Sequence, residues 1–147
     1  MAIAALPPLA VTFALGLLGV AELTGARPLA EPAARGLPEA IVLGDAGGAV
    51  RLLERGARPG AVGLIRRGVL FGQPVLATPF EAAVLARDVR MLGLLESYEA
   101  IGTQRAFLAC LARDLDAPEV ATRLAAAPAP ECEAGRAFAN LLARPGP

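Results

Sequence analysis

Few residues of this chain have the chemistry of a catalytic or metal-binding group. Histidine is absent, which removes the commonest general base and metal ligand. Ser97 is the only serine, and no base is evident for it. Cys110 and Cys132 lack both the histidine partner of a cysteine nucleophile and the CxxC spacing of a zinc site. The sequence therefore predicts no enzymatic activity, no cofactor and no metal.

Two other patterns contain residue types that small-molecule sites use. Glu96 with Glu99, and Asp114 with Asp116, are closely spaced carboxylates, but such pairs are usually solvated caps rather than acid–base sites. The glycine-rich stretch 44–48 follows no strand and precedes no Gly-Lys-Ser/Thr, so a phosphate loop is not expected. No small-molecule substrate is evident.

The two cysteines allow two interpretations. The favoured one treats Cys110 and Cys132 as small, buried apolar residues. A Cys110–Cys132 disulfide is the alternative if the domain lies in an oxidising compartment. Sequence alone does not place their Cβ atoms.

Composition and charge limit the classes of partner. The 147 residues are 55% hydrophobic, and 14 arginines balance 14 acidic residues, without a single lysine. The mean hydropathy of +0.53 is high for a purely soluble protein. A chain of zero net charge has no broad field for a phosphate backbone, so nucleic-acid binding is not expected. The composition, rich in Ala, Gly, Pro and Arg, is typical of a GC-rich bacterial genome.

The N-terminal segment is apolar and carries no charge before Glu22. A run of this length is a candidate transmembrane helix. Pro7 and Pro8 favour a helix that begins at Pro7, which would leave a span that is short for a bilayer. A secretory signal peptide is the main alternative, but no basic residue precedes the run. A buried core helix is less favoured, because the helix would be apolar all round. We expect a single-pass anchor over residues 1–23 in the bacterial inner membrane, followed by a linker over residues 24–37.

The side of the membrane is weakly specified. Arg27 and Arg35 follow the apolar run and nothing basic precedes it. The positive-inside rule then places the domain in the cytoplasm. A disulfide would argue for the periplasm.

Residues 78–96 predict a pair of short helices. Thr78 is suited to cap a helix and Pro79 to occupy its first position. Arg87-Asp88 interrupts the apolar pattern and predicts a tight turn before a second apolar face. Helices of about eight residues are too short to stand alone in water, so each must stack on a neighbour. Similar strings recur along the chain: Leu85-Ala86-Arg87-Asp88 as Leu111-Ala112-Arg113-Asp114, and Leu52-Leu53-Glu54 as Leu94-Leu95-Glu96.

These residues resemble the ankyrin repeat family. Thr78-Pro79-Phe80-Glu81-Ala82-Ala83 is similar to the T-P-L-H-x-A motif, with Glu81 in place of the histidine. The segment 52–59 is similar to the family's exit from the second helix. The resemblance implies a mainly α fold of two to three stacked helix hairpins over residues 38–127. An ordinary helical bundle is the alternative.

Two further elements complete the expected fold. Apolar runs divided by glycine and proline between Gly60 and Ala77 predict a β-hairpin that elongates one loop. A last helix over residues 131–143 would cap the stack, within a C-terminal part spanning 128–147. Asp116 is expected to cap the helix that follows it.

The hairpin and the first helices are the predicted partner-binding site. Exposed apolar surface such as that of the hairpin marks contact sites, and arginine pairs with carboxylates or lipid phosphates. The alternative is that Val69, Leu70 and Phe71 fold back onto the core. We expect a non-catalytic, membrane-anchored subunit that stabilises or assembles a larger membrane protein complex; an exported soluble binding protein, released by signal cleavage, is the alternative. The candidate partner-binding residues are Ile65, Arg66, Arg67, Val69, Leu70, Phe71, Glu81 and Leu85.

Overall fold

The structure is a computed structural model that describes residues 34–125 and 130–145. All described residues belong to one compact unit, Ala34–Pro147. The predicted anchor over residues 1–23 lies outside the described residues, as does most of the predicted linker. None of the described helices is long and apolar enough to cross a bilayer.

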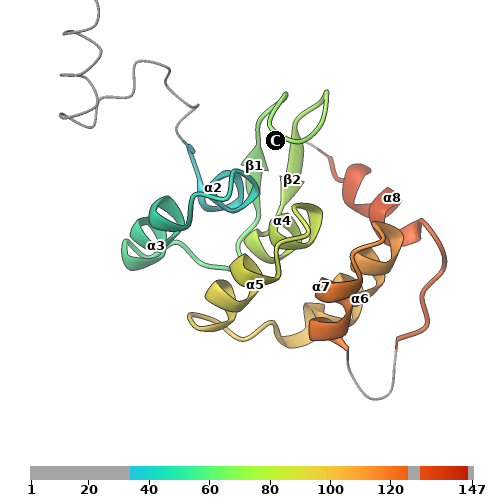
Figure 1. Cartoon of the computed structure of the whole chain (residues 1–147). Helices are drawn as coiled ribbons and strands as arrows, with labels where there is room; N and C mark the ends of the chain where they lie inside the picture. The colour runs from blue at the N-terminus through green and yellow to red at the C-terminus, as the bar shows by residue number, and fades with distance from the viewer. Residues whose placement is uncertain (1–33, 126–129, 146–147) are drawn as a thin grey trace, which may run out of the picture. The chain divides into compact units, whose positions relative to one another are not determined.

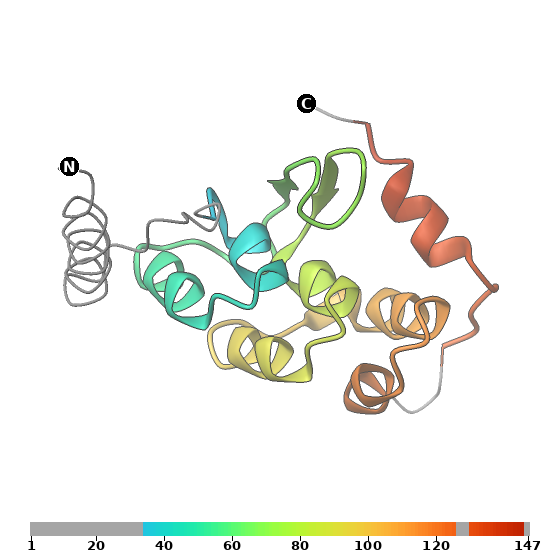
Figure 2. The same cartoon turned by 45° about the horizontal axis from the view of Figure 1, so that its top comes forward.

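Six helices form three successive pairs. They are α2 (Leu37–Val42) with α3 (Ala46–Glu54), α4 (Pro79–Leu85) with α5 (Val89–Glu96), and α6 (Arg105–Asp114) with α7 (Pro118–Leu124). A 3₁₀ turn over Gly102–Gln104 leads into α6. The first helices lie side by side, α2 against α4 and α4 against α6, while α5 packs against α7 (Figure 1, Figure 2). The pairs therefore stack.

The turn inside each pair has the same geometry. Gly44, Arg87 and Asp116 all adopt a left-handed backbone, with φ of 69°, 55° and 51°. In each turn the following N–H bonds to a carbonyl five residues back, which belongs to a fully buried alanine: Ala40, Ala83 or Ala112. Such a bond satisfies a carbonyl that the helix end would leave unpaired. Three local sequences thus produce one helix–turn–helix shape.

The start of α4 follows the predicted capping pattern. Thr78 accepts a hydrogen bond from the Glu81 N–H, and the Glu81 carboxylate accepts one from the Thr78 N–H. Pro79 occupies the first turn. This reciprocal capping box fixes the first turn of α4 locally.

The core runs through the whole stack. No helix among the described residues is longer than ten residues, so the pairs are held by buried side chains contributed by every pair rather than by helix propensity. The largest fully buried apolar side chains include Ile41, Phe80, Leu92, Leu108 and Leu111.

The long connection between α3 and α4 forms the predicted β-hairpin. Strand β1 (Gly63–Ile65) pairs antiparallel with β2 (Val75–Ala77), with Leu64 opposite Leu76. Strand β1 packs against α2. A Cβ on Gly63 would come within 2.9 Å of the Pro38 ring, so glycine permits this close approach.

The C-terminal helix α8 (Arg136–Leu142) packs against α6 and β2. A disulfide joins Cys110 in α6 to Cys132 before α8, with a Cα–Cα distance of 5.3 Å. The favoured expectation of two unbonded, buried cysteines is therefore wrong. Asp114 holds the start of α8, because its carboxylate accepts hydrogen bonds from the N–H groups of Gly135 and Phe138.

The mainly helical fold with one two-stranded hairpin is confirmed, and so is the helix pair within residues 78–96. Several boundaries differ. The last helix begins at Arg136 rather than at residue 131, because residues 130–135 carry the disulfide and the approach to Asp114. Asp116 lies in the left-handed turn, and Ala117 is the N-cap of α7 without a side-chain bond. Helix α2 starts at Leu37, the last residue of the predicted linker.

Candidate interaction surface

The two faces of the β-hairpin have opposite environments. Ile65 and Val75 lie opposite each other and point into the core, with exposed fractions of 1% and 4%. Their strand neighbours Leu64 and Leu76 point the other way, and Leu64 is 44% exposed. Alternation along each strand produces this division.

The tip of the hairpin folds back onto the protein. Val69, Leu70 and Phe71 are half-buried and pack against the core. The Phe71 ring lies 5.8 Å from the ring of Phe138 in α8, at a tilt of 52°. The alternative in which these three residues return to the core is therefore the one observed.

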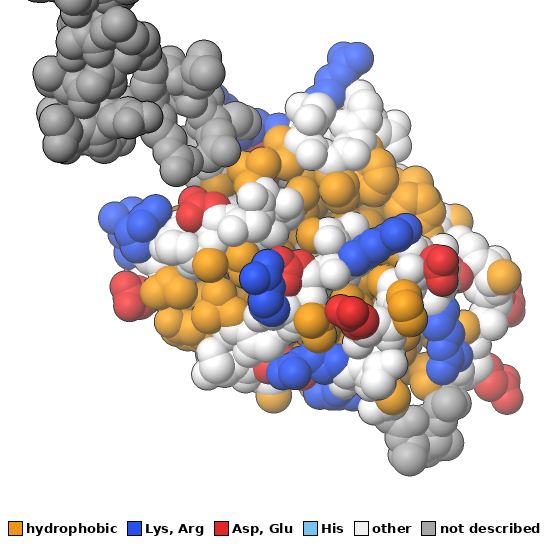
Figure 3. All heavy atoms as spheres, in the orientation of Figure 1, with side chains coloured by type: hydrophobic (Ala, Val, Ile, Leu, Met, Phe, Trp, Pro, Cys, Tyr) orange, Lys and Arg blue, Asp and Glu red, His pale blue; other side chains and the backbone are white. Residues whose placement is uncertain are grey.

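Apolar side chains remain exposed or half-buried on the outward side of the hairpin. We call this surface the hairpin face and define it by Val62, Leu64, Leu76 and Leu142. Val62 is 57% exposed, and Leu76 and Leu142 are half-buried. In Figure 3, hydrophobic side chains gather on the visible surface between the tip of the hairpin and α8. A pocket of about 270 Å³ opens between the hairpin and α8, and its lining includes Leu64, Pro74, Leu76, Leu142 and Arg144.

Arg66 forms an ion pair and hydrogen bonds with Glu39 inside the protein. Its Nε donates to Glu39 Oε1 at 2.6 Å, and its backbone N–H donates to the same oxygen at 2.9 Å. Burial alone would raise the pKa of Glu39. Its carboxylate accepts hydrogen bonds from the Arg66 side chain and from the N–H groups of Arg35 and Arg66, and it is attracted to the Arg66 charge. Together these interactions lower the pKa of Glu39 below its ordinary value of 4.5. The pair ties β1 to the first turn of α2.

Glu81 likewise forms an ion pair inside the protein, with Arg144. Its side chain is 2% exposed, and Arg144 binds it with two nitrogens, Nη1 to Oε2 at 2.7 Å and Nη2 to Oε1 at 2.5 Å. This hydrogen bonding raises the pKa of Arg144 above its ordinary value. Arg144 also lies over the Phe107 ring, 6.0 Å from its centre. Glu81 therefore joins α4 to the end of α8.

The eight predicted partner-binding residues consequently divide. Ile65, Glu81 and Leu85 are buried, so their side chains are not presented on the surface. Of the two arginines, Arg67 is exposed and Arg66 is bonded to Glu39. The predicted set includes the hairpin but not Val62 and Leu64, which are its exposed large apolar side chains. The alternation of Val62 and Leu64 with Ile65 indicates that the two sets face opposite sides of the hairpin, but it does not indicate which side faces the core.

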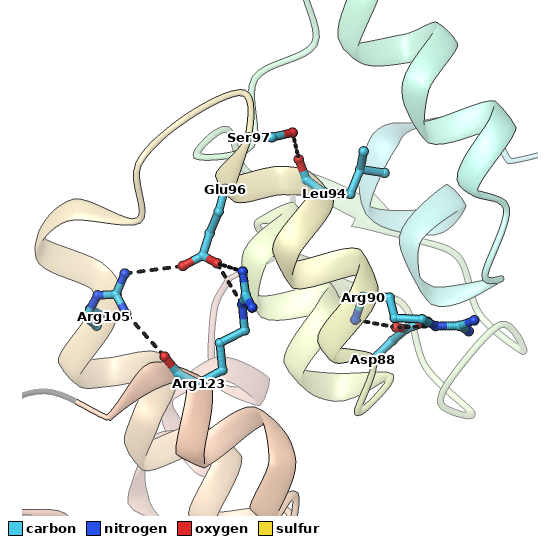
Figure 4. A network of polar contacts seen from close by, with 7 residues as sticks. All are labelled: Asp88, Arg90, Leu94, Glu96, Ser97, Arg105 and Arg123. Atoms are coloured by element: carbon cyan, nitrogen blue, oxygen red, sulfur yellow. Dashed lines mark hydrogen bonds and ion pairs between the residues drawn. The ribbon is translucent and has the colours of Figure 1, made fainter.

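A second polar cluster joins the second and third pairs. Glu96 at the end of α5 receives Arg105 from α6 at 3.2 Å and Arg123 from α7 at 2.6 Å (Figure 4). Ser97 donates to the Leu94 carbonyl at 2.6 Å. The Glu96 ion pairs hold neighbouring helices together, whereas the Ser97 bond is local to the end of α5. Glu96 and Glu99, which the sequence places close together, have different partners, because Glu99 faces Arg58 at 3.6 Å.

Among the described residues, no group of three or more Cys, Asp or Glu side chains could hold a metal ion. Asp114 and Asp116 also separate, one capping α8 and the other forming a turn. Comparison with protein-family models, with curated proteins and with solved structures finds no match.

Proposed function

We propose that this chain is a non-catalytic interaction subunit, anchored in a membrane through residues 1–23, that stabilises or assembles a larger membrane protein complex. The observation that carries the proposal is the hairpin face. Its side chains expose apolar area although the same hairpin buries Ile65 and Val75 on its other side. An exposed apolar area beside a pocket is typical of a contact site.

The surroundings of the hairpin face favour a rigid contact. The Arg66–Glu39 pair fixes β1, and the packing of Phe71 on Phe138 fixes the tip. A partner therefore meets a surface that is already ordered, and its binding does not have to supply the free energy of ordering the loop.

The three equivalent turns support the proposed relation to ankyrin repeats. Each pair places its first helix beside the first helix of the next, which is the arrangement expected of stacked repeats. In this interpretation residues 37–124 form three repeats, and the β-hairpin is the elongated connection between the first two.

The disulfide bears on the compartment. Disulfides persist on the oxidising side of a membrane and are rare in the cytosol. The Cys110–Cys132 bond therefore favours the periplasmic side over the cytoplasmic side that the arginine bias indicated. The same bond is also compatible with the alternative, an exported soluble binding protein.

The contact proposal is tested by capturing the full-length chain from membranes in mild detergent. Leu64→Asp should reduce recovery of the co-purifying complex roughly tenfold or more, because a buried leucine contributes about 1.5–3 kcal/mol. Leu43→Asp is the matched control, since Leu43 is 40% exposed but lies at the turn between α2 and α3. Equal recovery with the two variants would refute the assignment of the hairpin face.

Intact-mass analysis separates the two forms of the proposal. An anchored subunit retains residues 1–23 and sediments with membranes. A chain that has lost its N-terminal segment and remains in the soluble fraction is the exported binding protein instead.

A further inference from the structure

The disulfide lies where a thiol can reach it. Both Cys110 and Cys132 are half-buried rather than enclosed. A pocket of about 250 Å³ opens beside them, and its lining includes Phe107, Arg136 and Asn140. Access to a sulfur atom is the first requirement for thiol–disulfide exchange.

One of the two sulfur atoms has a cation beside it. Arg113 Nη1 lies 3.4 Å from Cys132 Sγ and 3.3 Å from the carbonyl oxygen of Pro130. A guanidinium at this distance stabilises a thiolate and lowers the pKa of the corresponding thiol. A cysteine of lower pKa is the better leaving group, so the environment directs attack to Cys110 and departure to Cys132.

We propose that Cys110–Cys132 is an exchangeable disulfide, reduced by a dithiol protein, and that it latches α8 onto the repeat stack. A thiolate of the dithiol attacks Cys110 Sγ, the sulfur–sulfur bond breaks, and Cys132 leaves as a thiolate beside Arg113. The second thiol of the dithiol then attacks the mixed disulfide and releases Cys110. Two electrons pass to the chain, the protons of the dithiol end on Cys110 and Cys132, and the dithiol becomes a disulfide.

Reduction leaves α8 held by non-covalent contacts alone. These include the packing of the buried Ala137 and Leu141 against α6 and β2. They also include the hydrogen bonds that Asp114 accepts at the start of α8, the contact between Phe71 and Phe138, and the ion pair between Glu81 and Arg144. The bond closes a loop between cysteines 22 residues apart. Removing such a constraint favours detachment by roughly two orders of magnitude.

Detachment of α8 would change the surface that the protein presents. The Glu81 carboxylate would lose Arg144, and the Phe107 and Phe71 rings would lose their cover. The pocket beside the hairpin face would lose the wall formed by Leu141, Leu142 and Arg144. The redox state of one bond would thereby control a groove along β2, α4 and α6.

The first test measures the rate at which dithiothreitol reduces the full-length chain, followed by mass spectrometry after alkylation. Arg113→Gln should slow reduction roughly fivefold, since the leaving thiolate loses its cation. Arg136→Gln is the matched control: Arg136 lines the same pocket, and its guanidinium pairs with Glu133 rather than with a sulfur. Equal slowing by both variants, or by neither, would overturn the role of Arg113.

The second test measures amide hydrogen exchange in the oxidised and reduced chain. Reduction should accelerate exchange in residues 136–142 about 100-fold and leave α2 to α5 nearly unchanged. The Cys110→Ala/Cys132→Ala variant should exchange like the reduced chain, with or without reductant. Unchanged protection of α8 would refute the latch, and so would loss of protection throughout the stack, since the bond would then be a support of the whole domain.

Discussion

The ion pair between Glu81 and Arg144 gives the sharpest test of how α8 is attached. The change is Arg144→Met, which keeps an unbranched apolar side chain and removes the guanidinium that pairs with Glu81 and lies over the Phe107 ring. Glu81 is 2% exposed, and its remaining described hydrogen-bond donor outside the helix is the Thr78 N–H at 2.7 Å. A buried carboxylate would thus lose its cation.

The magnitude follows from the burial of the two partners. Removing one member of a fully buried pair costs about 3–5 kcal/mol, because the other charge remains desolvated. The Arg144 side chain is 32% exposed, so water already reaches part of the pair and part of that cost is screened. We expect Arg144→Met to lower the free energy of unfolding by about 2 kcal/mol.

The assay is urea unfolding of the oxidised chain at pH 7, followed by circular dichroism. Arg136→Met is the control, because its pair with Glu133 has side chains 63% and 72% exposed and should contribute less than about 0.5 kcal/mol. A double-mutant cycle with Glu81→Gln should return a coupling of about 1.5 kcal/mol. Equal effects of the two methionine variants, or a coupling near zero, would refute the reasoning.

Three further predictions concern the hairpin and the turns. The pKa of Glu39 is depressed in the folded protein, so its stabilising contribution is present above about pH 4.5 and is lost as the pH falls through the folded-state pKa. Glu39→Gln should therefore reduce the dependence of the unfolding free energy on pH below 4.5, as measured by urea unfolding at a series of pH values. Gly44→Ala should lower the unfolding free energy by about 1 kcal/mol, whereas Arg87→Gly should raise it by about 0.5 kcal/mol, because both residues have a left-handed backbone; changes of the same sign would contradict this. Phe71→Ala should raise hydrogen exchange in α8 several-fold through loss of the contact with Phe138, and no change there would show that the tip does not support α8.

The elements that could be predicted have their signals close together in the sequence. Thr78, Pro79 and Glu81 specify the start of α4 within four residues, and Asp88 caps α5 through the N–H groups of Arg90 and Met91. The glycine and proline spacing of residues 60–77 was sufficient for a hairpin. Local hydrogen bonds decide these features, so a local pattern reveals them.

The features that were missed depend on distant residues. The partner of Glu81 is Arg144, 63 residues away, and the partner of Glu39 is Arg66, 27 residues away. The disulfide required the arrangement of α6 and α8, which spacing does not give. Which side of the hairpin faces the core also depends on where α2 lies. The local sequence does not give that position, and Ile65 was therefore predicted to be exposed in place of Leu64.

The two buried carboxylates explain why the hairpin and α8 lie where they do. Glu39 and Glu81 each occupy the third position of the first helix of a pair, and each accepts a backbone N–H from the residues just before its helix. Those bonds hold the carboxylate in place but leave its buried charge without a counter-ion. An arginine from outside the pair must therefore approach, and the chain supplies Arg66 at the end of β1 and Arg144 after α8. Because an unpaired buried charge costs several kcal/mol, alternative placements of these two segments are disfavoured by more than the loss of apolar contact alone. The acids are set locally by helix capping, and their charges then determine where the non-local segments pack.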